Sequence, residues 1–348
     1  MSQMPSRARS FPASFVRRAF TLTEMLVVIG IIALLIGILL PALGRVQQKA
    51  RQTESENLMQ EFGKACENFQ QQFGFYPGIV PEAILAGDPK ISGLENAVLH
   101  LCGGAIAGDD PNYNASTYSA WTEINFNSPA GTFNIKVNPA KVGEGPRIRG
   151  TQYKSFFSPK ASDLVVVKGQ GVGGSPDVDM DPYKLPDLVD AWGQPMLYFR
   201  QMRENGSSLM KGAQAGDTLN DAVFAYGGAK PYVESLGLGE LSQSQADSIF
   251  VAAPVARRNS TFAQVLRSVS YGKMGATATP GFTDAPNQGA KRGAIAILSA
   301  GPDGVYFSKY DGLGTRAIPR VDIVLDTENP KGPYIADEYD DLRVFTGG

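Results

Sequence analysis

The sequence is poor in the residues on which most catalytic and metal centres depend. Its 348 residues include one histidine, His100, and two cysteines, Cys66 and Cys102. A zinc site built on several histidines is therefore excluded, and a catalytic triad with a histidine base would have to use His100 itself. Leu99 and Leu101 flank this histidine, which favours a structural position for it. We therefore expect the chain not to be an enzyme.

The chain also lacks a large excess of either positive or negative charge. The chain carries 32 Lys and Arg residues against 34 Asp and Glu residues, a formal net charge of −2. Nucleic-acid-binding domains usually show a basic excess that neutralises phosphates. The composition therefore predicts no nucleic-acid partner. Glycine and proline are abundant, with 39 and 23 residues, and their concentration beyond residue 74 predicts long loops.

One stretch lacks charge altogether. No charged residue occurs from Met25 to Gly44, and twenty residues at about 1.5 Å each match the ~30 Å hydrocarbon core of a membrane. We therefore expect a spanning helix. Basic residues precede it without an acid before Glu24, and such an excess keeps that side in the cytoplasm. These basic residues are Arg7, Arg9, Arg17 and Arg18.

A secretory signal peptide is the main alternative for this stretch. Its apolar region spans only about 7 to 15 residues and is followed by a cleavage site of small residues. Here the apolar run is longer, and the segment from Pro41 to Gly44 leads into a continuing helical pattern. An ordinary signal peptide is therefore disfavoured.

The segment after the span has the pattern of an amphipathic helix. Its apolar residues recur at intervals of three and four, which places them on one face. They are Leu58, Phe62, Ala65, Phe69 and Phe73. Gly74 and Pro77 then predict the end of the helix. We expect one continuous helix from Leu22 to Phe73, with a kink or a melted turn at Pro41.

The N-terminal segment resembles the class III leader and first helix of type IV pilins and type II secretion pseudopilins. The matching residues are Arg17-Arg18-Ala19, then Phe20-Thr21-Leu22-Thr23-Glu24, the apolar run, and Pro41. In that family a prepilin peptidase cuts before the apolar run and methylates the new N-terminus. The resemblance implies a cut between Ala19 and Phe20 and an N-methylated Phe20. Ala19 replaces the family's usual glycine, so we expect slower processing.

Glu24 has two compatible interpretations. Thr21 and Glu24 have the spacing of a capping box, in which the glutamate accepts a hydrogen bond from the amide at the helix start. A carboxylate at the edge of hydrocarbon is also costly unless a partner charge neutralises it. In the pilin family that partner is the N-terminal ammonium of a neighbouring subunit in the filament. The resemblance therefore implies an assembly role for Glu24.

Two later segments resemble the major pseudopilins of type II secretion. Asp190-Ala-Trp-Gly-Gln-Pro is similar to the Asp-x-Trp-Gly-Asn-Pro box that opens the first strand of their sheet. Trp192 is expected to supply a large buried anchor, and Met196 to Arg200 predicts a strand. Residues 294–304, Ala-Ile-Ala-Ile-Leu-Ser-Ala-Gly-Pro-Asp-Gly, predict a central strand followed by a turn.

In those pseudopilins a similar turn begins an aspartate-rich loop that holds calcium. Asp303 matches the first part of that loop, and Asp340 and Asp341 match its end. Calcium takes six to eight oxygen ligands from carboxylates and carbonyls, which such a loop can supply. The intervening segment is longer than in the family and adds Asp311, Asp322 and Asp326. A solvated acidic turn is the alternative to a calcium site.

These patterns predict an α+β protein with a long N-terminal helix packed on a small antiparallel sheet, with long loops and an insertion. The expected parts are a cytoplasmic leader over residues 1–19, a transmembrane half-helix over 20–44 and an extracytoplasmic domain over 45–348. The insertion covers 201–291, with a helix expected near Thr261 to Val269. Cys66 and Cys102 would lie outside the cytoplasm, where they form either a bridge or two buried thiols.

The resemblance implies a structural subunit of a type II secretion pseudopilus. Such a subunit is matured by prepilin peptidase and assembles with other pilin-like subunits at an inner-membrane platform. The expected location is the inner membrane, with the N-terminus cytoplasmic and the domain periplasmic. The alternatives are a type IV pilus subunit for adhesion, motility or DNA uptake, and a membrane-tethered binding module or enzyme on a pilin-type anchor.

Overall fold

The computed structural model describes residues 21–88, 90–114, 116–166, 183–200, 293–306, 308 and 340–347. The chain divides into two compact units, Met1–Lys49 and Ala50–Gly348. One helix, α1 (Leu22–Phe73), contains residues of both units. The predicted insertion and its helix lie outside the described residues.

The described part of the first unit is the beginning of α1. Its large apolar side chains from Leu22 to Val46 are all exposed. Among the described residues, α1 is the one helix long and apolar enough to cross a membrane. Pro41 lies inside the unbroken helix, so the predicted melted turn does not form. The helix ends at Phe73 as predicted, because Gly74 adopts a φ of 79° and its amide donates to the Gln70 carbonyl at 2.7 Å.

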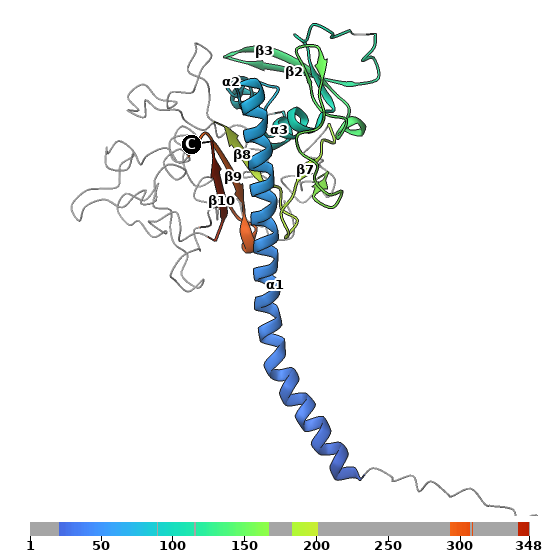
Figure 1. Cartoon of the computed structure of the whole chain (residues 1–348), viewed down its shortest axis with the longest axis vertical. Helices are drawn as coiled ribbons and strands as arrows, with labels where there is room; N and C mark the ends of the chain where they lie inside the picture. The colour runs from blue at the N-terminus through green and yellow to red at the C-terminus, as the bar shows by residue number, and fades with distance from the viewer. Residues whose placement is uncertain are drawn as a thin grey trace, which may run out of the picture. The chain divides into compact units, whose positions relative to one another are not determined.

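The second unit combines helices with small antiparallel sheets (Figure 1). Beyond α1 it contains α2 (Glu82–Gly87) and α3 (Gly93–Cys102). A three-stranded sheet has the order β10-β9-β8, with β8 at Leu197–Arg200, β9 at Ile295–Ser299 and β10 at Leu342–Thr346. The expected strands after Pro195 and at Ala294 are therefore present. The α+β class is confirmed.

A second three-stranded sheet has the order β1-β3-β2. Its strands are β1 (Ala105–Ala107), β2 (Thr122–Ser128) and β3 (Gly131–Val137). Two strand pairs complete the described structure, namely β4 (Arg147–Ile148) with β5 (Thr151–Gln152) and β6 (Leu164–Val165) with β7 (Asp187–Leu188). Short 3-10 turns follow β3 at Pro139–Lys141 and β9 at Gly301–Asp303. The sequence predicted one small sheet, whereas the described strands form four.

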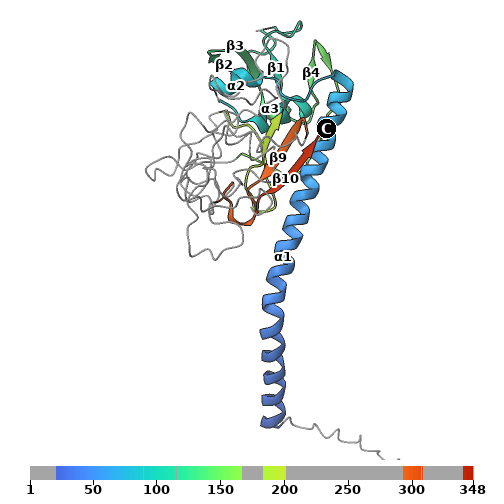
Figure 2. The same cartoon turned by 90° about the vertical axis from the view of Figure 1, so that its left-hand side faces the viewer.

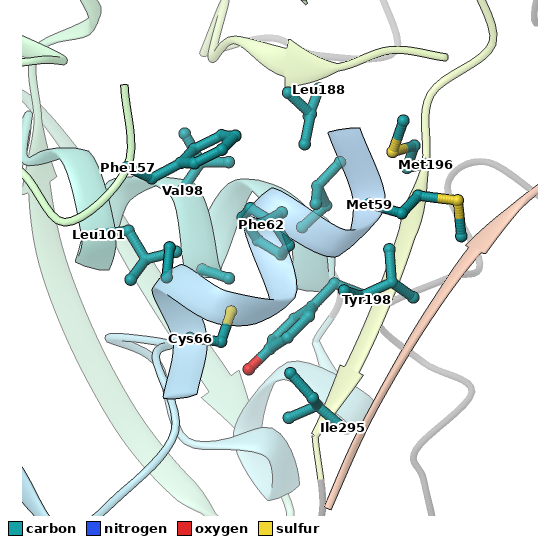
Figure 3. Close-up of a cluster of buried hydrophobic side chains, with 14 of the residues drawn as sticks. Met59, Phe62, Cys66, Val98, Leu101, Phe157, Leu188, Met196, Tyr198 and Ile295 are labelled. Carbon is teal, nitrogen blue, oxygen red and sulfur yellow. The ribbon is translucent and has the colours of Figure 1, made fainter. Parts of the chain in front are cut away.

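The main core lies where α1 meets α3 and the β10-β9-β8 sheet. Figure 3 shows Phe62 of α1 among Val98, Leu101, Phe157 and Tyr198. Its ring contacts Phe157 and Tyr198 edge to face, with centroids 5.2 and 5.6 Å apart. The predicted apolar stripe of α1 from Leu58 to Phe69 is buried.

Two smaller features complete the packing of the second unit. Gly63 lets β10 approach α1, because a Cβ at this position would lie 2.8 Å from Cγ2 of Thr346. A separate buried cluster, which includes Leu85, Ile124, Phe126 and Ile135, lies between α2 and the β1-β3-β2 sheet.

Candidate functional site

The start of α1 forms a complete capping box. The Thr21 amide donates to Glu24 Oε2 at 2.8 Å, and the Glu24 amide donates to Thr21 Oγ1 at 3.2 Å. The Thr21 hydroxyl also donates to Glu24 Oε2, at 2.8 Å. These bonds satisfy amides that the first helical turn leaves without partners. Ala19 and Phe20, the expected cleavage residues, lie outside the described residues.

The turn after β7 is organised by a buried carboxylate. Asp190 is 5% exposed, and its Oδ1 accepts hydrogen bonds from the amides of Trp192 and Gln194, each at 2.9 Å. Its Oδ2 accepts a hydrogen bond from the Ser299 hydroxyl at 2.6 Å. Burial raises the pKa of Asp190, while Ser299 and the turn amides oppose that rise. Asp190 therefore joins the turn to the end of β9.

The same turn is attached to α1. Ser55 is fully buried; its hydroxyl donates to the Arg51 carbonyl at 2.9 Å and accepts from the Ala191 amide at 3.0 Å. Trp192, expected as a buried anchor, is only partly buried against the main core. The sequence motif predicted that the Trp192 ring would anchor this turn. In the structure, the hydrogen bonds of Asp190 and Ser55 hold the turn in place instead. The Asp-x-Trp-Gly box contained the signal for Asp190, and no local signal marks Ser55.

The expected calcium residues come from two segments that lie together. Leu342 pairs with Ser299 in the β9–β10 ladder, so Asp340 and Asp341 lie at the same end of the sheet as the turn that contains Asp303. Gly301 has a φ of 69°, and a Cβ there would lie 2.6 Å from the Asp340 carbonyl oxygen. Asp303 Oδ1 accepts from the Val305 amide at 2.8 Å.

Carboxylates concentrate around this end of the sheet. Burial, followed by the nearby charges of Asp190, Asp341 and Asp187, raises the pKa of Tyr306 well above its usual value. The part of the chain that the structure describes contains no group of three or more His, Cys, Asp or Glu side chains that could hold a metal ion. The further candidate ligands Asp311, Asp322 and Asp326 lie outside that part.

The two cysteines are free and buried in the main core. Cys102 donates its thiol hydrogen to the Phe157 carbonyl, with sulfur and oxygen 3.3 Å apart. Burial raises the pKa of Cys102 to about 12 and that of Cys66 well above its usual value. Both thiols are thus protonated at neutral pH and are weak nucleophiles.

A partly buried polar cluster, which sequence reasoning missed, fixes the chain after α1. Arg200 donates to the carbonyl oxygens of Tyr76, Gly78 and Val80 at 2.8 to 3.0 Å. Its Nε donates to Glu82 at 2.7 Å. Burial nevertheless raises the pKa of Glu82, so desolvation outweighs the attraction of the guanidinium. The residues that form this cluster are too far apart in sequence for any motif to reveal it.

His100 belongs to the same region. Its Nδ1 accepts a hydrogen bond from the Gly78 amide at 2.9 Å, and the side chain is 8% exposed. Burial and then the Arg200 charge lower its pKa from 6.5 to about 3. The imidazole is therefore neutral at physiological pH and holds the backbone, as a structural histidine does.

No protein-family model, curated protein or solved structure matches this chain.

Proposed function

We propose that the chain is a structural subunit of a type II secretion pseudopilus. The single observation that carries the proposal is α1: an apolar helix with a Thr21–Glu24 capping box continues, without a break, into the core of an α+β domain. The segment in front of it carries the sequence Arg17-Arg18-Ala19-Phe20. An exposed apolar half-helix needs lipid or other helices around it. The membrane supplies the lipid before assembly, and the filament supplies the other helices afterwards.

The mechanism is assembly rather than chemistry. Prepilin peptidase removes residues 1–19, and the new ammonium at Phe20 becomes available to a neighbouring subunit's Glu24. Pairing these charges removes the cost of leaving either one alone at the edge of hydrocarbon. Subunits then leave the inner membrane at the assembly platform, and their α1 helices bundle while the periplasmic domains coat the fibre. The growing fibre supports the export of secreted proteins.

Calcium is part of the proposal as a stabiliser of the loop between β9 and β10. Asp303, Asp340 and Asp341 lie at one end of the sheet, next to the turn that Asp190 organises. Carboxylate and carbonyl oxygens are the ligands that calcium prefers. Binding would join the end of β9 to the start of β10.

The processing test is the intact mass of the protein extracted from the membranes of cells that produce the full chain. We expect a mature N-terminus at methylated Phe20. Ala19→Gly should be processed at least as fast, because it restores the family's usual residue, and Ala19→Leu should accumulate as precursor. A native N-terminus at any other residue contradicts the proposal.

The assembly test uses Glu24→Gln in the same cells. Glutamine also serves at the last position of a capping box, so the helix start is kept while the charge is lost. We expect normal insertion and cleavage but a several-fold smaller share of mature protein in the sheared filament fraction. Normal incorporation would leave capping as the only role of Glu24.

A further inference from the structure

The second unit carries two groups of charges that lie outside its described ion pairs. Those pairs join Lys90 to Asp88, Lys136 to Glu123, Lys141 to Glu144 and Arg200 to Glu82. A basic group, Arg147, Arg149 and Lys154, surrounds the β4–β5 hairpin, and an acidic group, Glu54 and Glu61, lies on α1. Among the described residues neither group has an ion-pair partner.

The basic group is held on a braced hairpin. Arg149 and Gly150 form its turn with φ values of 49° and 80°, the geometry that usually selects asparagine and glycine. The Gly150 amide donates to Asp110 Oδ2 at 2.9 Å, and Asn112 donates to the Gly150 carbonyl. Arginine is disfavoured in this backbone conformation, yet here it lies exposed at the tip of the hairpin. Such strain is typical of positions with a functional constraint.

The acidic group forms a stripe on α1. Glu54 and Glu61 are seven residues apart, which is within about 20° of two full helical turns, so both lie on the same side of the helix about 10 Å apart. Both glutamates are exposed. Leu58, which lies between them in sequence, and Phe62, which follows Glu61, are buried in the core. Two exposed cations flank the pair: Arg51 precedes Glu54 by three residues, and Lys64 follows Glu61 by three.

The two groups are too far apart to meet within one copy. Figure 2 shows β4 beside the C-terminal end of α1, where Tyr153 contacts Phe73 with ring centroids 5.0 Å apart. Glu61 and Glu54 lie 12 and 19 residues before Phe73, or about 18 and 28 Å along the helix. An arginine side chain cannot span that distance.

We propose that the β4–β5 hairpin of one copy docks on the Glu54–Glu61 stripe of a second copy, displaced by about 18 to 28 Å along the helix axis. The inference rests on the proposed filament function and names one of its contacts. Two different surfaces meet, so the contact is heterologous, and its repetition builds an open helical fibre rather than a closed dimer. The unlike charges set the stagger, because unshifted copies would bring like charges together.

The first test is disulfide cross-linking in sheared filaments of the full chain. A chain carrying both Thr151→Cys and Asn57→Cys, which are exposed positions beside Arg149 and between Glu54 and Glu61, keeps every charge of the two groups and should give a ladder beyond the dimer after mild copper–phenanthroline oxidation. A mixture of the two single variants should stop at dimers. Lys160→Cys combined with Asn57→Cys is the matched control, since Lys160 is an exposed cation outside the hairpin, and should give no ladder. The native cysteines are buried and should not react.

The second test is charge reversal. Arg149→Glu and Glu61→Arg should each lower the filament fraction at least fivefold, and the double variant should recover at least half of the wild-type amount. Arg149→Gly relieves the backbone strain but removes the charge, so it should melt no earlier than wild type while assembling poorly. This variant separates a docking role from a folding role.

The outcomes distinguish this contact from the general function. Filaments of the double-cysteine chain that give no ladder, or Arg149→Glu chains that assemble as well as wild type, overturn the proposed contact and leave the filament function standing. Failure of the wild-type chain to form any filament overturns both.

Discussion

At the residue scale, the contacts of Arg200 and His100 explain how a polar loop is kept inside the fold. The backbone from Tyr76 to Val80 follows a helix end and has no strand partner among the described residues, so its carbonyl and amide groups need side-chain partners. Arg200 supplies donors to three carbonyl groups, and His100 supplies an acceptor for the Gly78 amide. A neutral imidazole is required for that acceptor, because imidazolium has none.

Acid should destabilise the protein through His100. Its pKa is about 3 in the folded chain against an ordinary 6.5, so the unfolded chain binds the proton more readily between these values. The stabilisation is complete above pH 6.5 and is lost as the pH falls toward 3. The slope is about 1.4 kcal/mol per pH unit, which amounts to about 2 kcal/mol between pH 6.5 and 5.

The measurement is the thermal midpoint of the detergent-solubilised chain from pH 7 to pH 4.5, compared with His100→Gln. Glutamine keeps an acceptor for Gly78 but does not titrate, so this variant should show a flatter profile. The raised pKa of Glu82 acts in the opposite direction in both proteins and cancels in the comparison. Parallel profiles would show that His100 is not buried as described.

At the scale of elements, local patterns predicted the helices and strands better than their partners. The apolar stripe and Gly74 predicted the end of α1, and the apolar run at Ala294 predicted β9, because those signals lie within a few residues. The order β10-β9-β8 depends on pairing segments separated by many residues, and the division into four sheets has no local signature. The Thr21–Glu24 box was readable for the same local reason.

The candidate site shows the same division. Asp190 lies in a motif that the sequence displays, but its bond to Ser299 crosses 109 positions and its turn binds Ser55 across 136. A local motif can predict a turn. These long-range hydrogen bonds form only when the helix and the sheet pack together, so no local motif predicts them. The partial burial of Trp192 follows from that packing too, since Ser55 holds the turn backbone against α1 while Asp190 holds it to the end of β9.

Replacing the insertion should leave the described fold intact. Arg200 and Ile295 are directly paired across β8 and β9. The segment between them therefore leaves the sheet and returns to it at the same place. Replacing residues 201–292 with Asn-Gly leaves a four-residue hairpin loop that includes Gly293 and Ala294, a length that hairpins commonly use. Shortening the loop from 94 residues to four should lower its closure cost by about 2 to 3 kcal/mol.

We expect an unchanged or higher thermal midpoint and a single transition for this shortened chain, measured in detergent by circular dichroism. A control with the same deletion joined by Pro-Pro should fold poorly, because proline cannot form the tight turn that asparagine and glycine allow. Loss of cooperative melting in the Asn-Gly chain would mean that the core needs the removed residues.

At the scale of the whole molecule, calcium should raise the stability of the folded chain. A ligand that binds only the folded state adds RT ln(1 + [L]/Kd), about 2.7 kcal/mol at a hundredfold excess over Kd. The thermal midpoint of the full chain in millimolar calcium should therefore exceed that in chelator. Magnesium should act less, since it dehydrates reluctantly and needs tighter octahedral geometry.

Asp303→Asn provides the matched variant for the calcium measurement. Asparagine keeps an oxygen that can accept from the Val305 amide but removes the carboxylate charge, so the calcium shift should shrink while stability in chelator is preserved. Equal midpoints in calcium and chelator for the native chain would count against a calcium site.

The close approach of α1 and β10 also bears on how the protein is made. Gly63 meets Thr346, and the Gly347 amide donates to Glu67 across 280 positions. At 5 to 20 residues per second, the ribosome needs roughly 14 to 56 seconds to synthesise that interval. Throughout that time the apolar stripe of α1 lacks the strand β10 that packs on it, although α1 itself has already been synthesised. Translation speed therefore sets how long this face of α1 remains without the strand that packs on it.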